Sequence, residues 1–142
     1  MLGNNRVMTA IPVRDVDRAR GFYEGVLGLK FAGGPRADGS FEYECGAGTG
    51  LFTYPAQENA GESPATLAAW QVDEIETTAE VLRHKGVVLE EYDLPGLKTE
   101  DGIAVLPGGR TIWFKDPDGN ILNVFERDDR SRPCRPSPFA AG

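Results

Sequence analysis

Residues 13–17, Val-Arg-Asp-Val-Asp, have a counterpart 59 positions later in residues 72–76, Val-Asp-Glu-Ile-Glu. Each stretch follows a short apolar run of strand length and opens a segment whose apolar residues recur at helical spacing. After the helix the offset falls to 58, and residues 43–54 then lie opposite residues 113–124 at an offset of 70. Because the matching blocks follow in the same order, the sequence predicts an internal repeat.

Each copy of the repeat is predicted to fold as β-α-β-β-β, in about 60 residues. The first helix ends at Gly28. The second is capped by Asp73, with Glu76 three residues further on, and ends at Gly86. Residues 116–120, Asp-Pro-Asp-Gly-Asn, predict a tight turn between the last two strands. The predicted strands span residues 7–13, 30–32, 41–45 and 51–54, then 67–72, 87–92, 111–115 and 121–125.

The composition limits the class of protein. The chain has 142 residues, 40% of them hydrophobic, which is enough for a compact domain with a buried core. Its net charge of −7 argues against nucleic acid as a partner, because phosphate binding requires clustered Lys and Arg. No segment approaches the roughly 18 apolar residues of a membrane helix, and the N-terminus lacks a signal-peptide pattern. Cys45 and Cys134 form no CxxC pair, so we expect a cytoplasmic protein with no membrane partner.

The domain organisation follows from the repeat. We expect one domain over residues 1–126, with module one at about residues 6–56 and module two at about residues 66–126. Residues 127–142, rich in Pro, Ser and Arg, are expected to form a loosely ordered C-terminal tail. Residues 94–109 have no counterpart in module one, and they form either a flap over the site or a plain long loop.

Two motifs carry a resemblance to a known family. Residues 11–19, Ile-Pro-Val-Arg-Asp-Val-Asp-Arg-Ala, continue into Phe22-Tyr23 and Val26-Leu27-Gly28-Leu29, and residues 114–122 read Phe-Lys-Asp-Pro-Asp-Gly-Asn-Ile-Leu. They resemble the opening strand and helix and the closing hairpin of the vicinal-oxygen-chelate superfamily, which includes glyoxalase I, bleomycin-resistance proteins and extradiol dioxygenases. The resemblance covers roughly residues 6–126. It implies an α+β fold of two βαβββ modules with paired, cupped mixed sheets.

In enzymes that this chain resembles, His, Glu or Gln side chains at equivalent strand positions of both modules hold a divalent metal in the cup. The opening-strand position corresponds here to Met8 and, 59 residues on, to Leu67. The closing-strand position corresponds to Asn123 and, 70 residues earlier, to Thr53. These side chains are poor ligands for Zn²⁺, Fe²⁺ or Mn²⁺, and the one histidine, His84, is expected to be a solvated residue near a helix end. We therefore expect no metal, no cofactor and no catalytic residue.

Strand alternation predicts which side chains share the face of these four positions. If the turn is tight, Trp113 lies opposite Asn123, whereas Trp70 faces the helix and belongs to the core. Glu42 and Glu44 are expected on the outward, solvated face, and a shift of one residue would turn both inward and make the cup acidic. The predicted ligand-binding residues are Met8, Tyr43, Thr53, Leu67, Gln71, Thr111, Trp113, Asn123 and Phe125.

The favoured function is a metal-free protein that binds a small organic molecule, cationic or aromatic, in the cup, as a homodimer. The alternative is a metal-dependent lyase, isomerase or dioxygenase with ligands such as Glu42, Glu44 or Glu126 in a shifted register. A third possibility is a structural or regulatory subunit whose cup is simply packed. The sequence leaves open which ligand binds and whether the modules pair within one chain or between chains.

Overall fold

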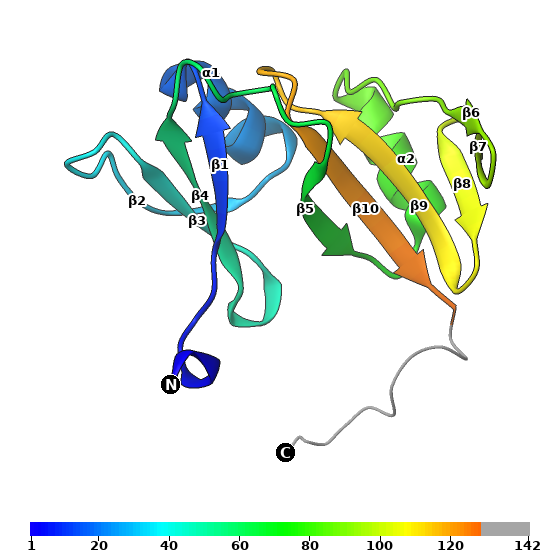
Figure 1. Cartoon of the computed structure of the whole chain (residues 1–142), viewed down its shortest axis with the longest axis horizontal. Coiled ribbons are helices and arrows are strands. Elements are labelled where there is room, and N and C mark those ends of the chain that lie inside the picture. The colour runs from blue at the N-terminus through cyan, green and yellow to red at the C-terminus, as the bar shows by residue number, and fades with distance from the viewer. Residues whose placement is uncertain (129–142) are drawn as a thin grey trace.

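The computed structural model describes residues 1–128 and contains two β-sheets, each with a helix packed on one face (Figure 1). The sheets lie side by side, and their parallel edge strands, β1 and β5, contact each other. The fold is α+β, with one sheet and one helical segment in each half of the sequence. None of the helices among the described residues is both long and apolar enough to span a membrane.

Module one has the expected element order and a four-stranded sheet with the order β1-β4-β3-β2. Strand β1 runs parallel to β4, and the other neighbouring strands are antiparallel. The Asp15 carboxylate caps the helix by accepting hydrogen bonds from the backbone N–H groups of Asp17 and Arg18. Its elements are η1 (Leu2–Asn4), β1 (Thr9–Val13), α1 (Val16–Arg20), which continues as the π-helical turn η2 (Gly21–Val26), β2 (Lys30–Gly33), β3 (Phe41–Glu44), η3 (Gly46–Gly48) and β4 (Gly50–Pro55).

Module two repeats this arrangement and extends it. Its sheet has the order β5-β10-β9-β8-β7-β6, in which β5, β10 and β9 correspond to β1, β4 and β3 of module one. Its elements are β5 (Thr66–Gln71), α2 (Ile75–His84), β6 (Asp93–Leu94), β7 (Leu97–Glu100), β8 (Ile103–Leu106), β9 (Gly109–Lys115) and β10 (Ile121–Arg127).

Residues 87–109 differ from the prediction. The expected strand over residues 87–92 is reduced to one bridge, between Leu89 and Phe114, beside a hydrogen bond of 2.8 Å from the Glu90 N–H to the Trp113 carbonyl. Residues 94–109 form neither a flap nor a plain loop, because they fold into β6, β7 and β8. Strand β8 pairs with β9 at residues 109–111, so residues 87–92 reach only the other half of that edge.

Two expectations about where elements begin and end are also wrong. The N-cap of α2 is Glu74, not Asp73, and its side chain makes no cap. The Glu126 carboxylate of β10 accepts the Ile75 N–H at 2.8 Å instead, so a neighbouring strand supplies the capping group. The expected tail began at Arg127, but Arg127 is the last residue of β10. The remainder of that predicted tail, residues 129–142, lies outside the described residues.

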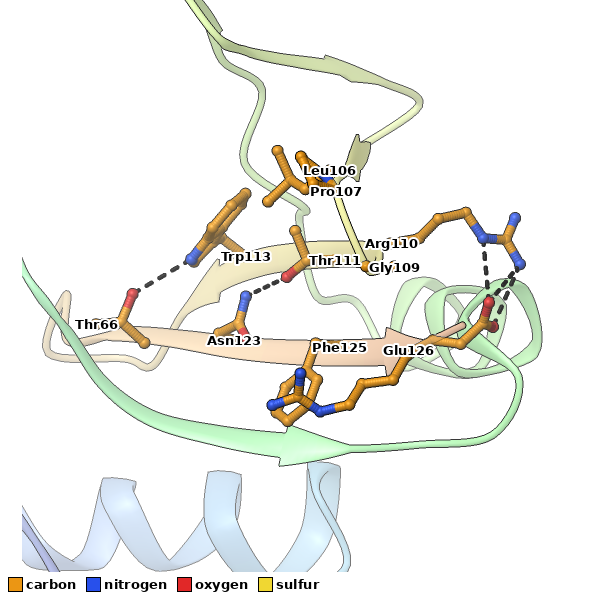
Figure 2. A pocket seen from close by; sticks show the side chains of 12 residues that line it. Thr66, Leu106, Pro107, Gly109, Arg110, Thr111, Trp113, Asn123, Phe125 and Glu126 are labelled. Atoms are coloured by element: carbon orange, nitrogen blue, oxygen red, sulfur yellow. Dashed lines mark hydrogen bonds and ion pairs between the residues drawn. The ribbon is translucent and has the colours of Figure 1, made fainter. Parts of the chain in front are cut away.

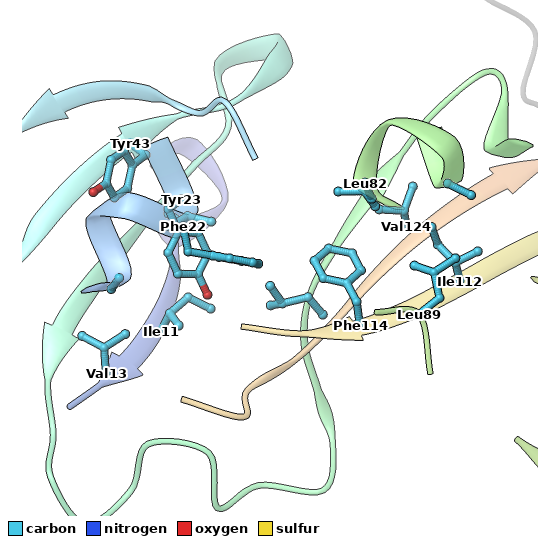
Figure 3. Packing of buried hydrophobic residues seen from close by; sticks show 14 of the residues in the cluster. Ile11, Val13, Phe22, Tyr23, Tyr43, Leu82, Leu89, Ile112, Phe114 and Val124 are labelled. Carbon is cyan, nitrogen blue, oxygen red and sulfur yellow. The ribbon is translucent and has the colours of Figure 1, made fainter. Parts of the chain in front are cut away.

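One hydrophobic core joins both modules (Figure 3). The rings of Phe22, from η2, and Phe114, from β9, have their centroids 6.4 Å apart across the boundary. The predicted core residues Ile11, Val13 and Leu122 are fully buried, and Trp70 packs half-buried against the same core. The helices therefore cover one side of both sheets and leave the opposite faces available for a site.

The turn at residues 116–120 also fastens module two to module one. The buried Asp116 carboxylate accepts a hydrogen bond of 2.7 Å from the Tyr23 hydroxyl, and Asn120 donates one of 2.7 Å to the Pro12 carbonyl. Arg18 of α1 forms an ion pair of 2.7 Å with Asp118. The turn predicted from the sequence is thus an anchoring point between the two halves of the molecule.

Candidate functional site

A cavity of about 370 Å³ lies on the face of β9 and β10 that points away from α2 (Figure 2). Its volume falls within the range of small-molecule sites, roughly 300–1,000 Å³. All of the described residues that line it belong to module two. They are Thr66, Leu106, Pro107, Gly108, Gly109, Arg110, Thr111, Trp113, Asn123, Phe125, Glu126 and Arg127.

Four of the predicted ligand-binding residues come together in this cavity. Trp113 pairs with Asn123, and Thr111 pairs with Phe125, across the antiparallel strands β9 and β10. Directly paired residues share one face of a sheet, so these side chains line the cavity together. The Trp113 indole donates a hydrogen bond of 3.2 Å to the Thr66 hydroxyl, and its ring meets that of Tyr92 edge-on with centroids 5.5 Å apart. These contacts hold the aromatic wall in place.

The polar floor of the cavity is internally bonded. The amide nitrogen of Asn123 donates to the Thr111 hydroxyl and to the Ile112 carbonyl, the latter at 3.0 Å. The Thr111 hydroxyl in turn donates to the Val124 carbonyl at 3.1 Å. Within residues 1–128, no donor reaches the Asn123 Oδ1. The floor therefore offers a ligand one hydrogen-bond acceptor and holds no nucleophile or proton-transfer group.

The charged residues of the lining lie on two different faces. Arg110 and Glu126 turn toward α2, where the Arg110 guanidinium contacts Glu126 at 3.0 Å and Glu76 at 3.0 Å (Figure 2). Hydrogen bonding to Glu126 raises the pKa of Arg110 above its ordinary value, which keeps the guanidinium charged. Arg127 instead places its guanidinium over the Phe125 ring, 5.0 Å from the centroid. Its positive charge therefore lies on the cavity side of the sheet.

Tyr43 and Thr53, predicted as cup residues, are fully buried on the helix side of module one. Tyr43 stacks on Tyr23 with ring centroids 6.4 Å apart, and its hydroxyl donates a hydrogen bond of 2.8 Å to Glu24. Burial raises the pKa of the Tyr43 hydroxyl, so it remains protonated. The prediction placed these two residues on the wrong face of the sheet.

The strand pairing explains this error. Thr53 pairs with Ile11, whereas Val124 pairs with Trp70, which is the counterpart of Ile11. Thr53 therefore corresponds to Val124, and the true offset between these strands is 71 instead of 70. Because side chains alternate along a strand, this one-residue difference exchanges the two faces. Phe52, and not Thr53, is the counterpart of Asn123.

The remaining predicted residues lie elsewhere. Met8 is half-buried near Arg6, Leu67 is half-buried beside a register shift between β5 and β10, and Gln71 is exposed at the end of β5. None of these three is among the residues that line the described cavity. The structure thus brings together only those predicted residues that belong to β9 and β10.

Glu42 and Glu44 lie on the face of module one opposite its helix, which is the cup face, and not on the solvated face away from the cup, where they were expected. The one-residue shift explains this reversal; below, the face opposite the helix is called the outward face of each module. Glu42 contacts Arg36 at 2.7 Å and Arg6 at 3.3 Å, and Glu44 contacts Lys30 at 3.6 Å. The hydrogen bond from Arg36 is the main cause that lowers the pKa of Glu42. The face is an array of ion pairs and does not form the acidic cavity that a shift would have implied.

The donor set does not fit a divalent metal. With the register corrected, the positions that the family resemblance implies as ligand positions carry Met8, Phe52, Leu67 and Asn123. A thioether, a phenyl ring, an alkyl chain and an amide do not provide the imidazole, carboxylate or thiolate ligands that Zn²⁺ or Fe²⁺ requires. Within residues 1–128, no three His, Cys, Asp or Glu side chains are grouped closely enough to hold a metal, and His84 is exposed.

Sequence reasoning missed Arg127 and the wall formed by Leu106 and Pro107. Alternation from Asn123 through Phe125 reaches Arg127 in steps of two, so the signal for Arg127 was present. The Pro, Ser and Arg content of the following segment obscured it. Leu106 and Pro107 belong to the segment expected to be a flap or loop, and no pattern in the sequence places them beside Thr111.

Comparisons with known proteins agree with this architecture. The sequence matches the model of the Glyoxalase/Bleomycin resistance protein/Dioxygenase superfamily over residues 5–124. A search of curated proteins found no match.

Similar solved structures include TnmS3, an antibiotic binding protein from Streptomyces sp. CB03234, with a TM-score of 0.69, 21% identity and coverage of 90% of this chain and 99% of that one. The fosfomycin resistance protein FosX from Listeria monocytogenes has a TM-score of 0.69, 14% identity and coverage of 93% and 98%. A glyoxalase family protein from Enterococcus faecalis has a TM-score of 0.66, 23% identity and coverage of 89% and 100%. At these identities the likeness concerns the fold.

Proposed function

We propose that this chain, which belongs to the Glyoxalase/Bleomycin resistance protein/Dioxygenase superfamily, binds a small planar organic molecule in the cavity of module two and releases it unchanged. The observation that carries the proposal is the combination of an aromatic wall with a neutral, internally bonded floor. Trp113 and Phe125 supply flat apolar surface, and the Asn123 Oδ1 supplies one orienting acceptor. Such a mixture is typical of organic-ligand pockets.

Reversible binding without catalysis is supported by the chemistry of the lining. Its one carboxylate, Glu126, is bonded to Arg110 and to the Ile75 N–H at the start of α2. A general base must reach the proton that it removes, and Glu126 points to the other side of the sheet. The residues at the metal-ligand positions do not favour a Lewis acid in this site.

The structural relatives support a role in handling a foreign or bioactive compound. TnmS3 is described as an antibiotic binding protein, and FosX as a fosfomycin resistance protein. The chain shares their fold along most of its length. We therefore propose sequestration of such a compound as the biological role.

Tryptophan fluorescence tests the proposal directly, because the chain has two tryptophans in different environments. Trp113 stands in the cavity, whereas Trp70 packs against the core on the helix side. In a screen of planar organic compounds, we expect hits to quench the fluorescence of Trp70→Phe, which retains Trp113. The same hits should leave the fluorescence of Trp113→Phe nearly unchanged. Equal quenching of both variants, or no saturable hit, would contradict binding in this cavity.

We further propose that the protein is a homodimer in which module one of one copy covers the cavity of the other. The described residues that wall the cavity all belong to module two, and one side of it is open. The outward face of module one presents two half-buried rings, Phe52 and Tyr54, with centroids 6.1 Å apart. Sedimentation over a concentration series should show a dimer that Phe52→Glu converts to a monomer. A wild-type monomer throughout the series would contradict this arrangement.

A further inference from the structure

The cavity face of β10 carries one charged side chain. Residues Asn123, Phe125 and Arg127 alternate onto this face, while Glu126 turns toward α2. The Arg127 guanidinium lies 5.0 Å from the centroid of the Phe125 ring, in a cation–π contact. Among the residues that the structure describes, no carboxylate comes within ion-pair distance of Arg127. Its charge is therefore available to a ligand.

The neighbouring arginine does not share this property. Arg110 is held by Glu126 and Glu76, each at 3.0 Å, so its charge is balanced on the helix side of the sheet. The lining consequently carries one net positive charge, from Arg110, Arg127 and Glu126, although the whole chain has a net charge of −7. Net charge describes the average surface, whereas ligand selection depends on the groups that line the site.

We infer that the cavity selects an aromatic anion, a planar ring system with a carboxylate or sulfonate, and that Arg127 determines this specificity. This inference rests on the proposed function. The ring of the ligand packs against Trp113 and Phe125, and its anionic group accepts hydrogen bonds from Arg127. The planar guanidinium is suited to a bidentate contact with such a group, and its position over Phe125 reduces the freedom lost on binding. A donor at the inner end of the ligand would meet the Asn123 Oδ1.

The inference disfavours a cationic ligand, which was one of the kinds of ligand that the sequence allowed. A cation in this cavity would lie beside the Arg127 guanidinium, which no carboxylate within residues 1–128 balances. Like charges at close range disfavour binding, and this cost increases where water is partly excluded. The structure therefore points to the opposite charge from that of the chain as a whole.

Two matched dyes test the inference. The anionic probe is 1-anilinonaphthalene-8-sulfonate, and the neutral probe is N-phenyl-1-naphthylamine, which has the same ring system without the sulfonate. We expect Arg127→Gln to weaken binding of the anionic dye about tenfold, as for the loss of one charge-assisted hydrogen bond. Binding of the neutral dye should change by less than about twofold, since stacking on the rings is retained. Added salt should weaken only the anionic dye.

The control variant is Arg83→Gln, which removes the same charge from α2, on the other side of the sheet. It should leave both affinities unchanged, so a loss there would indicate a long-range charge effect and contradict the role of Arg127. Trp113→Ala separates the two proposals, because it should weaken both dyes. If Trp113→Ala weakens both dyes but Arg127→Gln weakens them equally or not at all, the inference about charge fails while the binding function stands. If neither dye depends on Trp113, both proposals fail.

Discussion

The outward faces of the two modules carry different side chains at equivalent positions. In module one, Glu42 pairs with Phe52 across β3 and β4, and in module two Trp113 pairs with Asn123 across β9 and β10. Glu42 is held in ion pairs with two arginines, whereas Trp113 stands in a cavity. The repeated backbone thus provides two similar sheets, and the outward residues decide which of them offers a site.

Module two also has a wall that module one lacks. The sheet of module one ends at β2, the neighbour of β3, whereas in module two β8 takes that position beside β9 and the sheet continues into β7 and β6. Leu106 and Pro107, at the end of β8, lie beside Thr111 and close one side of the cavity (Figure 2). The site therefore depends both on the side chains of β9 and β10 and on the added hairpins.

Truncation of one aromatic residue in each module should give the largest contrast. Tyr43→Ala removes a fully buried ring from the core of module one and should lower the free energy of unfolding by about 3–5 kcal/mol. Trp113→Ala removes a ring that is only half-buried and should cost about 1–2 kcal/mol. Urea unfolding followed by circular dichroism measures both effects.

Ligand binding should show the reverse order. Tyr43→Ala, or the milder Tyr43→Leu if the alanine variant does not fold, should bind a cavity ligand as the wild type does. Trp113→Ala should lose that binding. If the two variants were equally destabilised and equally impaired in binding, the assignment of the two faces would be wrong.

A smaller effect is expected where the two modules join. Asp116→Ala removes a buried carboxylate that accepts hydrogen bonds from Tyr23 and Asn120, at 2.7 Å and 2.9 Å. Leaving these buried donors unpaired should lower the free energy of unfolding by about 2–4 kcal/mol. Asp38→Ala is the matched control, because Asp38 also accepts a backbone N–H, that of Ser40, but at an exposed turn.

The shape of the unfolding transition gives further information on the contact between the modules. One core joins both modules, so we expect the wild type and Asp116→Ala each to unfold in a single cooperative transition. Two separate transitions in the wild type would indicate that the modules are independent. An Asp116→Ala variant as stable as Asp38→Ala would show that the turn does not anchor the modules.

Two threonines sharpen the comparison at the level of single atoms. The Thr53 hydroxyl, buried in module one, has no hydrogen-bond partner among the described residues, and Thr53→Val should stabilise the protein by about 1 kcal/mol. The Thr111 hydroxyl bonds to Val124 and Asn123, and Thr111→Val should destabilise it by about 1–2 kcal/mol. Thermal unfolding measures both changes in stability, which should have opposite signs. A loss of stability in Thr53→Val would contradict the register of β4 described above.

Most of the fold was predictable from the sequence because its signals are local. Helical spacing, the turn at residues 116–120 and the order of the repeated blocks depend on neighbouring residues, and the structure confirms the β-α-β-β-β order of module one. The faces of β9 and β10 were also predictable, because a tight turn sets the register between the two strands. The sequence therefore places Trp113 and Asn123 on the same face of the sheet, and the strand pairing agrees.

The rest of the site depends on the residue offset between the modules and on strand pairing, which the sequence alone does not constrain. An offset of 70 instead of 71 between the modules exchanged the faces of β3 and β4, and it placed Tyr43 and Thr53 wrongly. The pairing partners of residues 94–109 are set by the free edge of β9, which is a property of the assembled sheet. The alternation along β10 extends to Arg127, but the Pro, Ser and Arg content of residues 127–142 predicts an irregular tail there.

The smallest expected effect concerns the ion pairs that occupy the outward face of module one. Hydrogen bonding from Arg36 lowers the pKa of Glu42, so ionised Glu42 is stabilised more in the folded than in the unfolded protein. Its contribution to stability is therefore present above the unfolded pKa of about 4.3 and is lost as the pH falls through the lower folded pKa. At pH 7, Glu42→Gln should cost less than about 1 kcal/mol, because the pair is partly solvated.

A pH series of thermal unfolding curves measures this difference between the wild type and Glu42→Gln. The two curves should converge as the medium becomes acidic, and added salt should reduce the gap at neutral pH. Glu58→Gln is the control, since Glu58 is exposed in the loop after β4 and forms no ion pair within residues 1–128. A gap that stayed constant with pH would mean that Glu42 acts through packing instead of charge. In that case the outward face of module one would depend on packing more than on its ion pairs, and in this respect it would resemble the outward face of module two.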